Sequence, residues 1–131
     1  MQANKLAKTK SRNTVTAILY GIKNCDTVKK ARRFLENNNI HYQFHDFRQE
    51  GISTELINGW CQLTSWENLL NRRSRTYHAL TDSIKNNINE TSIIQLICEQ
   101  PTLIKRPVLS YQGQLYLGYS DKEYQEIFSH A

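Results

Sequence analysis

An α/β domain is the fold class that this sequence predicts, with the element order β-α-β, a helical block, and then β-β-α. Strand-like and helix-like patterns alternate within residues 15–47, which is typical of a βαβ unit. Apolar residues in the middle of the chain, 53–100, recur with helical spacing. Two short strand patterns and a last helix follow Pro101. The two halves of the sheet are therefore expected to be separated by an all-helical insertion.

The βαβ unit begins with residues 15–21, a β-prone and mostly apolar run that indicates a central strand buried on both faces. Residues 26–38 then place apolar side chains at every third or fourth position, which predicts an amphipathic helix. Residues 42–47 return to a strand pattern. Because such crossovers are normally right-handed, the two strands are expected to pair in parallel.

The helical insertion has apolar positions that share helix faces, such as Ile57, Trp60 and Cys61. Cys98 lies on a similar face, so core packing is the favoured interpretation for both of these cysteines. A capping box that starts at Thr64 is expected to begin one of the helices.

The last part of the chain predicts strands over 108–111 and 115–119, joined by a tight turn at Gln112-Gly113. Ser120 and Glu123 fit a capping box at the start of the closing helix.

Net charge first suggests a nucleic-acid partner, because the 131 residues carry +5. Four of the basic residues lie in residues 1–14, which contain no acidic residue, and without them thirteen basic residues face twelve acidic ones. The remaining core is nearly neutral and its tyrosines are scattered, so we expect no specific DNA binding by the core. Residues 1–14 are predicted to be a disordered basic tail, and residues 15–131 to form a single domain.

Localisation and metal content follow from what the chain lacks. No apolar run is long enough to span a membrane, and the N-terminus has no secretory signal pattern. Three widely spaced cysteines fit a reducing cytoplasm better than a disulfide scaffold. The sequence has no Cys-x-x-Cys or His-x-x-His pair, so we expect no metal site and no bound cofactor.

Cys25 is the strongest candidate for chemistry, because it follows the first strand at the predicted start of a helix, where parallel βαβ units bind ligands. The helix dipole and nearby Lys23 favour its thiolate, whereas Asp26 either opposes this or caps the helix. The alternative interpretation is a buried structural cysteine. The candidate binding residues around Cys25 are Lys23, Asn24, Asp26 and Thr27.

Two further segments carry cations. Arg106 and Pro107 open the third strand, where proline suits the first position. From the sequence alone, a trans bond is the more common state, and a cis bond would turn the backbone toward the site. Arg72, Arg73 and Arg75 are expected at the end of a helix, either as a solvated cap or as an anion clamp.

Three segments together carry a resemblance: the first strand followed by Gly-Ile-Lys-Asn-Cys-Asp-Thr-Val-Lys-Lys-Ala-Arg, Leu-Leu-Asn at 69–71, and Ile-Lys-Arg-Pro at 104–107. The chain resembles the ArsC/Spx family of thioredoxin-like proteins, and most closely its YffB-like branch. The resemblance runs from about Val15 to the C-terminus. It implies a thioredoxin-like βαβ…ββα core with a helical insertion.

The resemblance also implies roles. Cys25 falls on the family's nucleophilic cysteine, Arg106 on an arginine that holds an oxyanion beside it, and Pro107 on a cis-proline. Asn71 stands where the arsenate reductases carry a second anion-binding arginine, and about Gly118 where they carry a third, so arsenate is not assigned as the substrate.

The implied activity is that of a glutathione-dependent thiol reductase, in which Cys25 attacks a mixed disulfide while Arg106 and Arg73 bind an anionic group. An external thiol, glutathione or glutaredoxin, would close the cycle. Two alternatives stay open. One is a Spx-like regulatory protein that binds RNA polymerase without turnover, although Val28 replaces the second cysteine of the Spx Cys-x-x-Cys switch. The other is a domain in which Cys25 is only structural.

Overall fold

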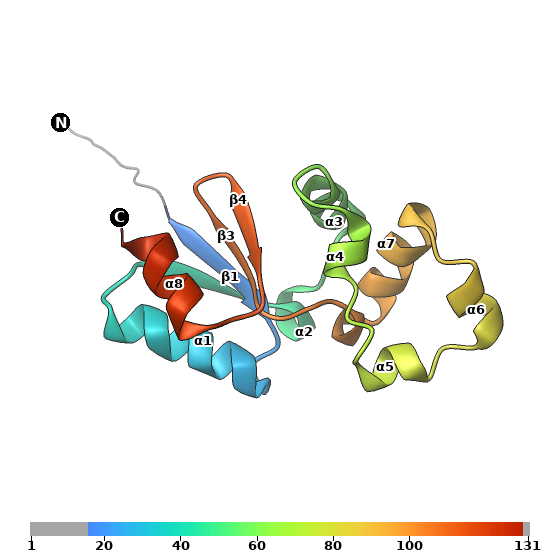
Figure 1. The fold of residues 1–131 in the computed structure, drawn as a ribbon, viewed down its shortest axis with the longest axis horizontal. Coiled ribbons are helices and arrows are strands. Elements are labelled where there is room, and N and C mark those ends of the chain that lie inside the picture. Colours follow the sequence, from blue (N-terminus) through green and yellow to red (C-terminus); the bar gives the residue numbers. More distant parts are fainter. Residues whose placement is uncertain (1–15, 130–131) are drawn as a thin grey trace.

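The computed structural model describes residues 16–129, so the predicted basic tail at 1–14 lies outside the described residues. The element order is β-α-β, a series of helices, and β-β-α, as the sequence predicted (Figure 1). The elements are β1 (Ala17–Gly21), α1 (Asp26–Asn37), β2 (Tyr42–Asp46), α2 (Phe47–Glu50), α3 (Thr54–Cys61), α4 (Trp66–Leu69), α5 (Arg75–His78), α6 (Asp82–Asn86), α7 (Glu90–Glu99), a 3₁₀ turn (Pro101–Leu103), β3 (Val108–Tyr111), β4 (Gln114–Leu117) and α8 (Asp121–Phe128).

The sheet has the strand order β2-β1-β3-β4. β1 pairs in parallel with β2, with Ala17 opposite Tyr42, and antiparallel with β3 on its other side. β4 completes the sheet as an antiparallel partner of β3. β1 is therefore a central strand, and its apolar composition follows from burial on both faces.

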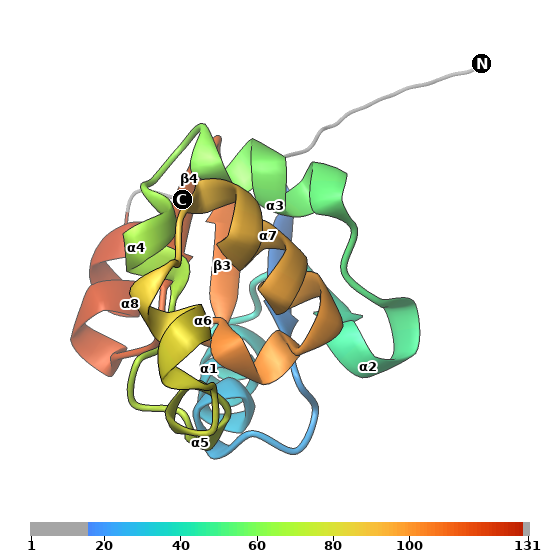
Figure 2. The same cartoon turned by 90° about the vertical axis from the view of Figure 1, so that its right-hand side faces the viewer.

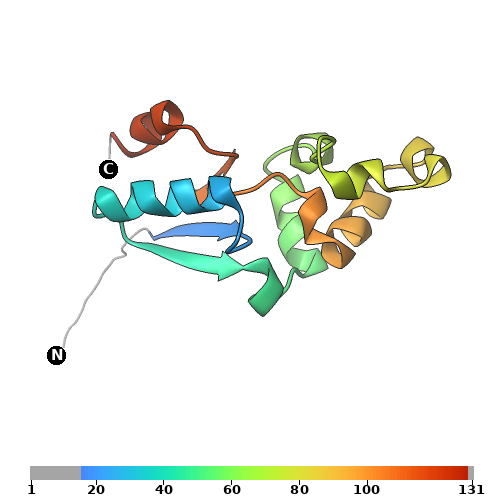
Figure 3. The same ribbon diagram turned by 90° about the horizontal axis from the view of Figure 1, so that it is seen from below.

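The two faces of the sheet bury different side chains of β1, because successive strand residues point to opposite sides. Ala17 and Leu19 pack with Leu35 of α1 and Tyr124 of α8, and all four are fully buried. α1 and α8 lie on this same side of the sheet (Figure 3). We call the sheet together with α1 and α8 the sheet layer.

The opposite set of side chains joins a second core. Tyr20 and Ile22 pack in one cluster with Ile57 and Trp60 of α3 and Ile97 of α7. These helices belong to the helical insertion, defined as residues 54–99 with α3 to α7. The insertion lies beyond the carboxyl ends of β1 and β2 (Figure 3), and in a view from that side it covers the sheet (Figure 2).

Helices in the insertion depend on side chains that cap their first turns. Ser53, Ser74 and Thr81 each accept a hydrogen bond from the backbone N–H three residues on. Asn89 and Ser92 form a reciprocal capping box at the start of α7. The capping box predicted at Thr64 is wrong: α4 begins after Ser65, and the Thr64 hydroxyl instead accepts from the Asn68 amide at 3.0 Å.

Two predicted strand ends also differ from the structure. The second strand ends at Asp46 rather than residue 47, because the Asp46 carboxylate accepts from the Arg48 N–H at 2.9 Å and starts α2. The fourth strand ends at Leu117 rather than residue 119, since Gly118 takes a φ of +80° and leaves the extended conformation. The predicted capping box at Ser120 is half formed: the Ser120 hydroxyl accepts from the Glu123 N–H at 3.1 Å, but among the described residues the Glu123 carboxylate does not accept from the Ser120 N–H.

Within residues 16–129, every helix is too short or too polar to cross a membrane.

Candidate functional site

The loop between β1 and α1 brings the end of the strand against the first turn of the helix. A Cβ atom at Gly21 would lie 2.7 Å from Cγ2 of Val28, so only glycine allows this approach without displacement. The Cys25 N–H donates to the Ile22 carbonyl at 3.1 Å, and the Lys29 N–H donates to the Cys25 carbonyl at 2.9 Å. These bonds place Cys25 at the N-cap of α1.

Cys25 has the extended backbone of an N-cap residue, with φ −85° and ψ 126°, and its side chain makes no capping hydrogen bond. The first-turn N–H groups of α1 carry the partial positive charge of a 12-residue helix. The thiol is half-buried, and the Asp26 carboxylate, which is exposed, lies in the same first turn. Cys25 therefore lies at the positive end of the α1 dipole.

A cavity of about 200 Å³ opens beside Cys25. It is bounded by the β1–α1 loop, by α2, and by the segment that leads into β3. Its lining residues are Ile22, Asn24, Cys25, Arg48, Thr102 and Arg106. The structure thus brings Cys25, Asn24 and Arg106 together, three residues that the sequence placed in one site.

Arg48 and Thr102 are cavity residues that the sequence did not identify. Arg48 depends on α2, which was not predicted from the sequence, because the predicted strand ended at residue 47 and no element was assigned to residues 48–50. The sequence signal that could have predicted α2 is Asp46 followed by Glu50. The Asp46 side chain caps the helix, and the Asp46 N–H donates to the Glu50 carboxylate at 3.4 Å. No local pattern marks Thr102, which lies in the 3₁₀ turn.

Arg106 has an incompletely satisfied guanidinium. Its Nη1 donates to the Pro101 carbonyl at 3.5 Å, whereas its buried Nε has no hydrogen-bond partner among the described residues. A buried donor without a partner costs free energy, so an anionic ligand at this position would be favourable. The Arg106–Pro107 peptide bond is cis, as the family resemblance implied, and Pro107 is buried.

A second and larger cavity, about 490 Å³, has Arg106 as a lining residue in common with the first. We call it the basic cavity. Its lining residues are Glu67, Leu70, Asn71, Arg72, Arg73, Lys105, Arg106 and Gly118.

A short antiparallel bridge between Leu70 and Ile104 builds the basic cavity. The Asn71 N–H donates to the Leu103 carbonyl at 2.7 Å, and the Lys105 N–H donates to the Leu69 carbonyl at 2.9 Å. Two segments far apart in the sequence are thereby joined. The arginines after Asn71 consequently line the same cavity as Arg106.

The predicted helix end at the arginine cluster is therefore wrong. α4 ends at Leu69, because Leu70 leaves the helix to form the bridge. Arg72 and Arg73 lie in a turn after it, and Arg75 is the first residue of α5. Arg72 and Arg73 are exposed and lie beyond the last turn of α4, whereas Arg75 lies in the single turn of α5.

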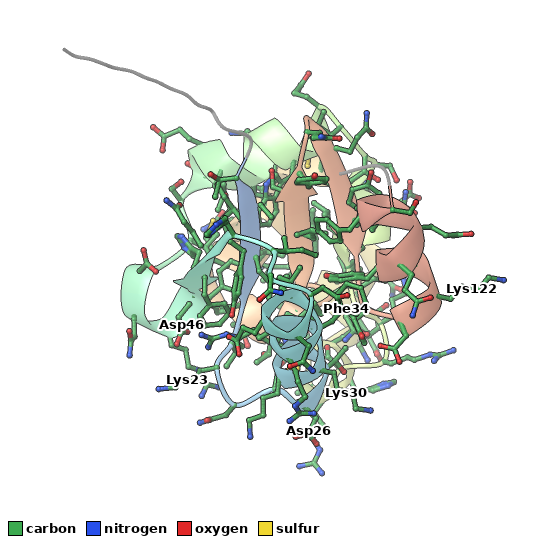
Figure 4. The ribbon with its side chains drawn as sticks, turned by 90° about the vertical axis from the view of Figure 1, so that its left-hand side faces the viewer. Lys23, Asp26, Lys30, Phe34, Asp46 and Lys122 are labelled. Carbon is green, nitrogen blue, oxygen red and sulfur yellow. The ribbon has the colours of Figure 1, made fainter. Side chains whose placement is uncertain are left out.

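The remaining candidate residues line neither cavity. Lys23 and Asp26 are exposed and extend outward from the surface (Figure 4), and Thr27 is half-buried in the first turn of α1. Pro107 is buried. In the part of the chain that the structure describes, no three His, Cys, Asp or Glu side chains come together as metal ligands.

The other two cysteines are half-buried and pack against the core cluster of the insertion. Burial raises the pKa of the Cys61 thiol, and the Glu90 carboxylate adds to this effect. Burial likewise raises the pKa of the Cys98 thiol, with a contribution from Glu99. All three cysteines are free thiols, and Val28 is fully buried three residues after Cys25.

Three features together define the class of protein. They are a cysteine at a helix N-terminus, an arginine before a cis-proline, and a sheet built from a β-α-β unit followed by a β-β-α unit. This is a thioredoxin-like protein of the arsenate reductase-like class. Residues 20–127 match the ArsC family. The chain belongs to the ArsC family.

Curated relatives agree with this assignment. An uncharacterised protein from Haemophilus influenzae is 40% identical over 111 residues, covering 85% of this chain and 97% of the relative. The global transcriptional regulator Spx from Lactiplantibacillus plantarum is 30% identical over 108 residues, covering 81% of each chain.

Solved structures have the same fold. The YffB protein is 40% identical with a TM-score of 0.80, and the match covers 85% of this chain and 97% of that one. An arsenate reductase-related protein from Brucella melitensis is 38% identical with a TM-score of 0.73, covering 90% and 98% of the two chains.

Proposed function

We propose that the protein is a glutathione-dependent thiol reductase that uses Cys25 as its nucleophile. One observation carries the proposal: the cavity at Cys25 also contains Arg106, whose buried Nε has no hydrogen-bond partner among the described residues. The thiol supplies a nucleophile at the positive end of α1, and the guanidinium supplies a donor for an anionic substrate group. Thiols are kept reduced in the cytoplasm, where we place the protein.

The reaction proceeds by two thiol–disulfide exchanges. The Cys25 thiolate attacks the glutathionyl sulfur of a mixed disulfide, the substrate S–S bond breaks, and the substrate thiolate leaves with the electron pair and takes up a proton. Cys25 then carries the glutathionyl group. The thiolate of a second glutathione attacks the glutathionyl sulfur of this mixed disulfide. The S–S bond to Cys25 breaks, glutathione disulfide is released, and the Cys25 thiolate is restored.

An external thiol is required because, among the described residues, no cysteine besides Cys25 lines its cavity. Val28 occupies the position of a resolving cysteine in a Cys-x-x-Cys motif, and Cys61 and Cys98 pack against the core of the insertion. Glutathione is the natural reductant for such a single-cysteine site, and glutaredoxin is the alternative thiol donor.

Arginines bind and orient the substrate in this proposal. Arg48 and Arg106 line the cavity at Cys25 from different segments, so carboxylates of glutathione can bind on either side of the sulfur. Asn24 adds an amide at the rim. Arg73 lines the basic cavity, where it binds the more distant part of the substrate.

The decisive experiment exposes the protein to glutathione disulfide and measures intact mass and the modified peptide. We expect one glutathionyl group on Cys25, retained in a Cys61→Ser/Cys98→Ser variant and lost in Cys25→Ser. Arg106→Ala slows adduct formation, whereas Arg75→Ala, which removes a cation that lines neither cavity, leaves the rate unchanged. No adduct on Cys25, or equal effects of the two arginine variants, would refute the assignment.

A transcriptional regulator is the second candidate, favoured by the 30% identity to Spx over 108 residues. In that case the protein acts through contacts with RNA polymerase and has no turnover. Two assays separate the candidates: glutathione consumption with a glutathionylated peptide, and binding of purified RNA polymerase. Turnover that depends on Cys25 supports the reductase, whereas polymerase binding that Cys25→Ser preserves, without turnover, supports the regulator.

A further inference from the structure

We propose that the basic cavity is a subsite for the γ-glutamyl end of glutathione, which carries both a carboxylate and an ammonium group. The cations of the cavity bind the carboxylate, and Glu67 binds the ammonium. This inference rests on the proposed reductase function and goes beyond it, because it assigns an orientation of the substrate and a residue that selects for the amino group.

Cations in the basic cavity are available for a ligand. Arg72, Arg73 and Lys105 are exposed, and together with Arg106 they give the lining four positive charges against the single carboxylate of Glu67. Within residues 16–129, none of these cations lies within 4 Å of an acidic oxygen, since the salt bridge found there joins His45 and Glu50. Their charge is therefore not neutralised inside the protein.

The backbone that carries these cations is fixed by hydrogen bonds. The Asn71 side-chain oxygen accepts from the Arg73 N–H at 3.1 Å, and the Ser74 hydroxyl donates to the Asn71 carbonyl at 2.8 Å. The bridge between Leu70 and Ile104 holds the same turn against the segment before Arg106. A turn held in place loses less conformational entropy when it binds a ligand.

Glu67 distinguishes the basic cavity from a simple anion site. Its carboxylate lines the cavity with four cations, yet among the described residues it forms no ion pair with any of them. A site for a phosphate or a simple carboxylate gains nothing from this negative charge. A zwitterionic α-amino acid end matches both signs, because its ammonium can pair with Glu67 while its carboxylate pairs with an arginine.

The dimensions and connection of the cavities agree with this orientation. The cavity at Cys25 measures about 200 Å³ and the basic cavity about 490 Å³, and Arg106 lines both. A ligand whose sulfur lies at Cys25 can therefore contact, through Arg106, a residue that also lines the basic cavity. The glycine end of glutathione has a carboxylate but no ammonium, so it fits beside Arg48 in the smaller cavity.

Gly118 keeps the wall of the basic cavity free of a side chain. Its φ of +80° favours glycine over any residue with a Cβ, and its N–H donates to the Pro107 carbonyl at 2.9 Å. The backbone of the wall is thereby tied to the proline that follows Arg106.

The test compares how fast Cys25 forms a mixed disulfide with two probes, glutathione disulfide and the disulfide of glutaryl-cysteinylglycine, which is glutathione without its amino group. We expect the wild-type protein to react about two- to fivefold faster with glutathione disulfide, the range of an exposed ion pair. Glu67→Gln brings this ratio to about one. Glu126→Gln, which makes the same charge change on α8, leaves the ratio as in the wild type.

The outcomes are distinguishable. A simple anion site would react faster with the deaminated probe, which carries one more net negative charge in each half of the disulfide. Glu67→Gln would then leave that preference in place, and either result overturns the subsite. Failure of both probes to modify Cys25 refutes the reductase function itself. Neutral 2-hydroxyethyl disulfide, which has no charged group for the cations or Glu67 to bind, must react with Cys25 equally in all variants, so a misfolded variant is recognised.

Discussion

The sheet layer and the helical insertion obtain their order from different sources. Strand pairing and packing against two helices of 12 and 8 residues bury Ala17 and Leu19 of the central strand in the sheet layer. Within the insertion, α5 and α6 are single turns that bury no side chain, and side-chain caps satisfy their first N–H groups. The candidate site combines the two: Cys25 precedes α1 of the sheet layer, and the insertion supplies Glu67, Arg72 and Arg73 of the basic cavity.

The largest expected effect of a substitution is therefore in the sheet layer. Leu19→Ala removes a fully buried side chain from the central strand and should lower the free energy of unfolding by about 3 kcal/mol. Ile84→Ala in α6, where the side chain is 39% exposed, should cost less than about 1 kcal/mol. Urea unfolding measures both. Equal losses would show that the insertion is as tightly packed as the sheet layer.

Gly21 gives the next effect, at the junction of β1 with the helix that carries Cys25. Gly21→Ala places a Cβ 2.7 Å from Val28 Cγ2, and we expect a loss of about 2 kcal/mol from overpacking. Val28→Ala removes the clashing methyl groups, so the double variant should be more stable than the sum of the single effects predicts. A double-mutant cycle with no coupling would contradict the proposed contact.

Thiol reactivity compares the two regions directly. Burial raises the pKa of Cys61 and Cys98, so at neutral pH a smaller fraction of these thiols is ionised than in an ordinary cysteine. Iodoacetamide should therefore modify Cys25 roughly tenfold faster near neutral pH. The rates at Cys61 and Cys98 should continue to rise at alkaline pH values at which an ordinary thiol is already ionised. Peptide mapping against pH tests this, and modification of Cys61 or Cys98 first would contradict it.

Helix caps give the smallest effect. Asn89→Ala removes the capping box of α7, whose Ile93, Ile94 and Ile97 are buried, and should cost about 1 kcal/mol of global stability. Thr81→Ala removes the cap of α6, which buries nothing, so it should speed hydrogen exchange locally and leave global unfolding unchanged. A global loss from Thr81→Ala would mean that α6 unfolds together with the core.

The sheet layer could be predicted from the sequence because its pattern is local. The βαβ unit is identified by an apolar run, then by apolar residues that recur about every 3.6 positions as in a helix, and then by a second strand pattern. The burial of β1 confirms that interpretation. The predicted ends of the second and fourth strands were less accurate. Asp46 ends its strand by capping α2, and Gly118 follows its strand with a positive φ, and neither effect is visible in the hydropathy pattern.

The insertion was predicted only in outline. Its single-turn helices are too short for periodicity to locate them, and its best cap, Asn89 with Ser92, differs from the Ser/Thr-x-x-Glu pattern. In the site, Cys25 stood out through its place at a helix start, and Arg106 through the family resemblance. The basic cavity could not be predicted, because it depends on the pairing of Leu70 with Ile104, which leaves no local trace.

That pairing makes residues 71–103 a closed loop that leaves and re-enters the domain at one point. Lengthening such a loop costs little, roughly 0.6 kcal/mol for each doubling of its length. The exposed turns on either side of α6 can therefore gain or lose residues while Arg106 keeps its place beside Cys25. An engineer who wishes to attach a reporter or a second domain to this protein has a tolerant insertion point there.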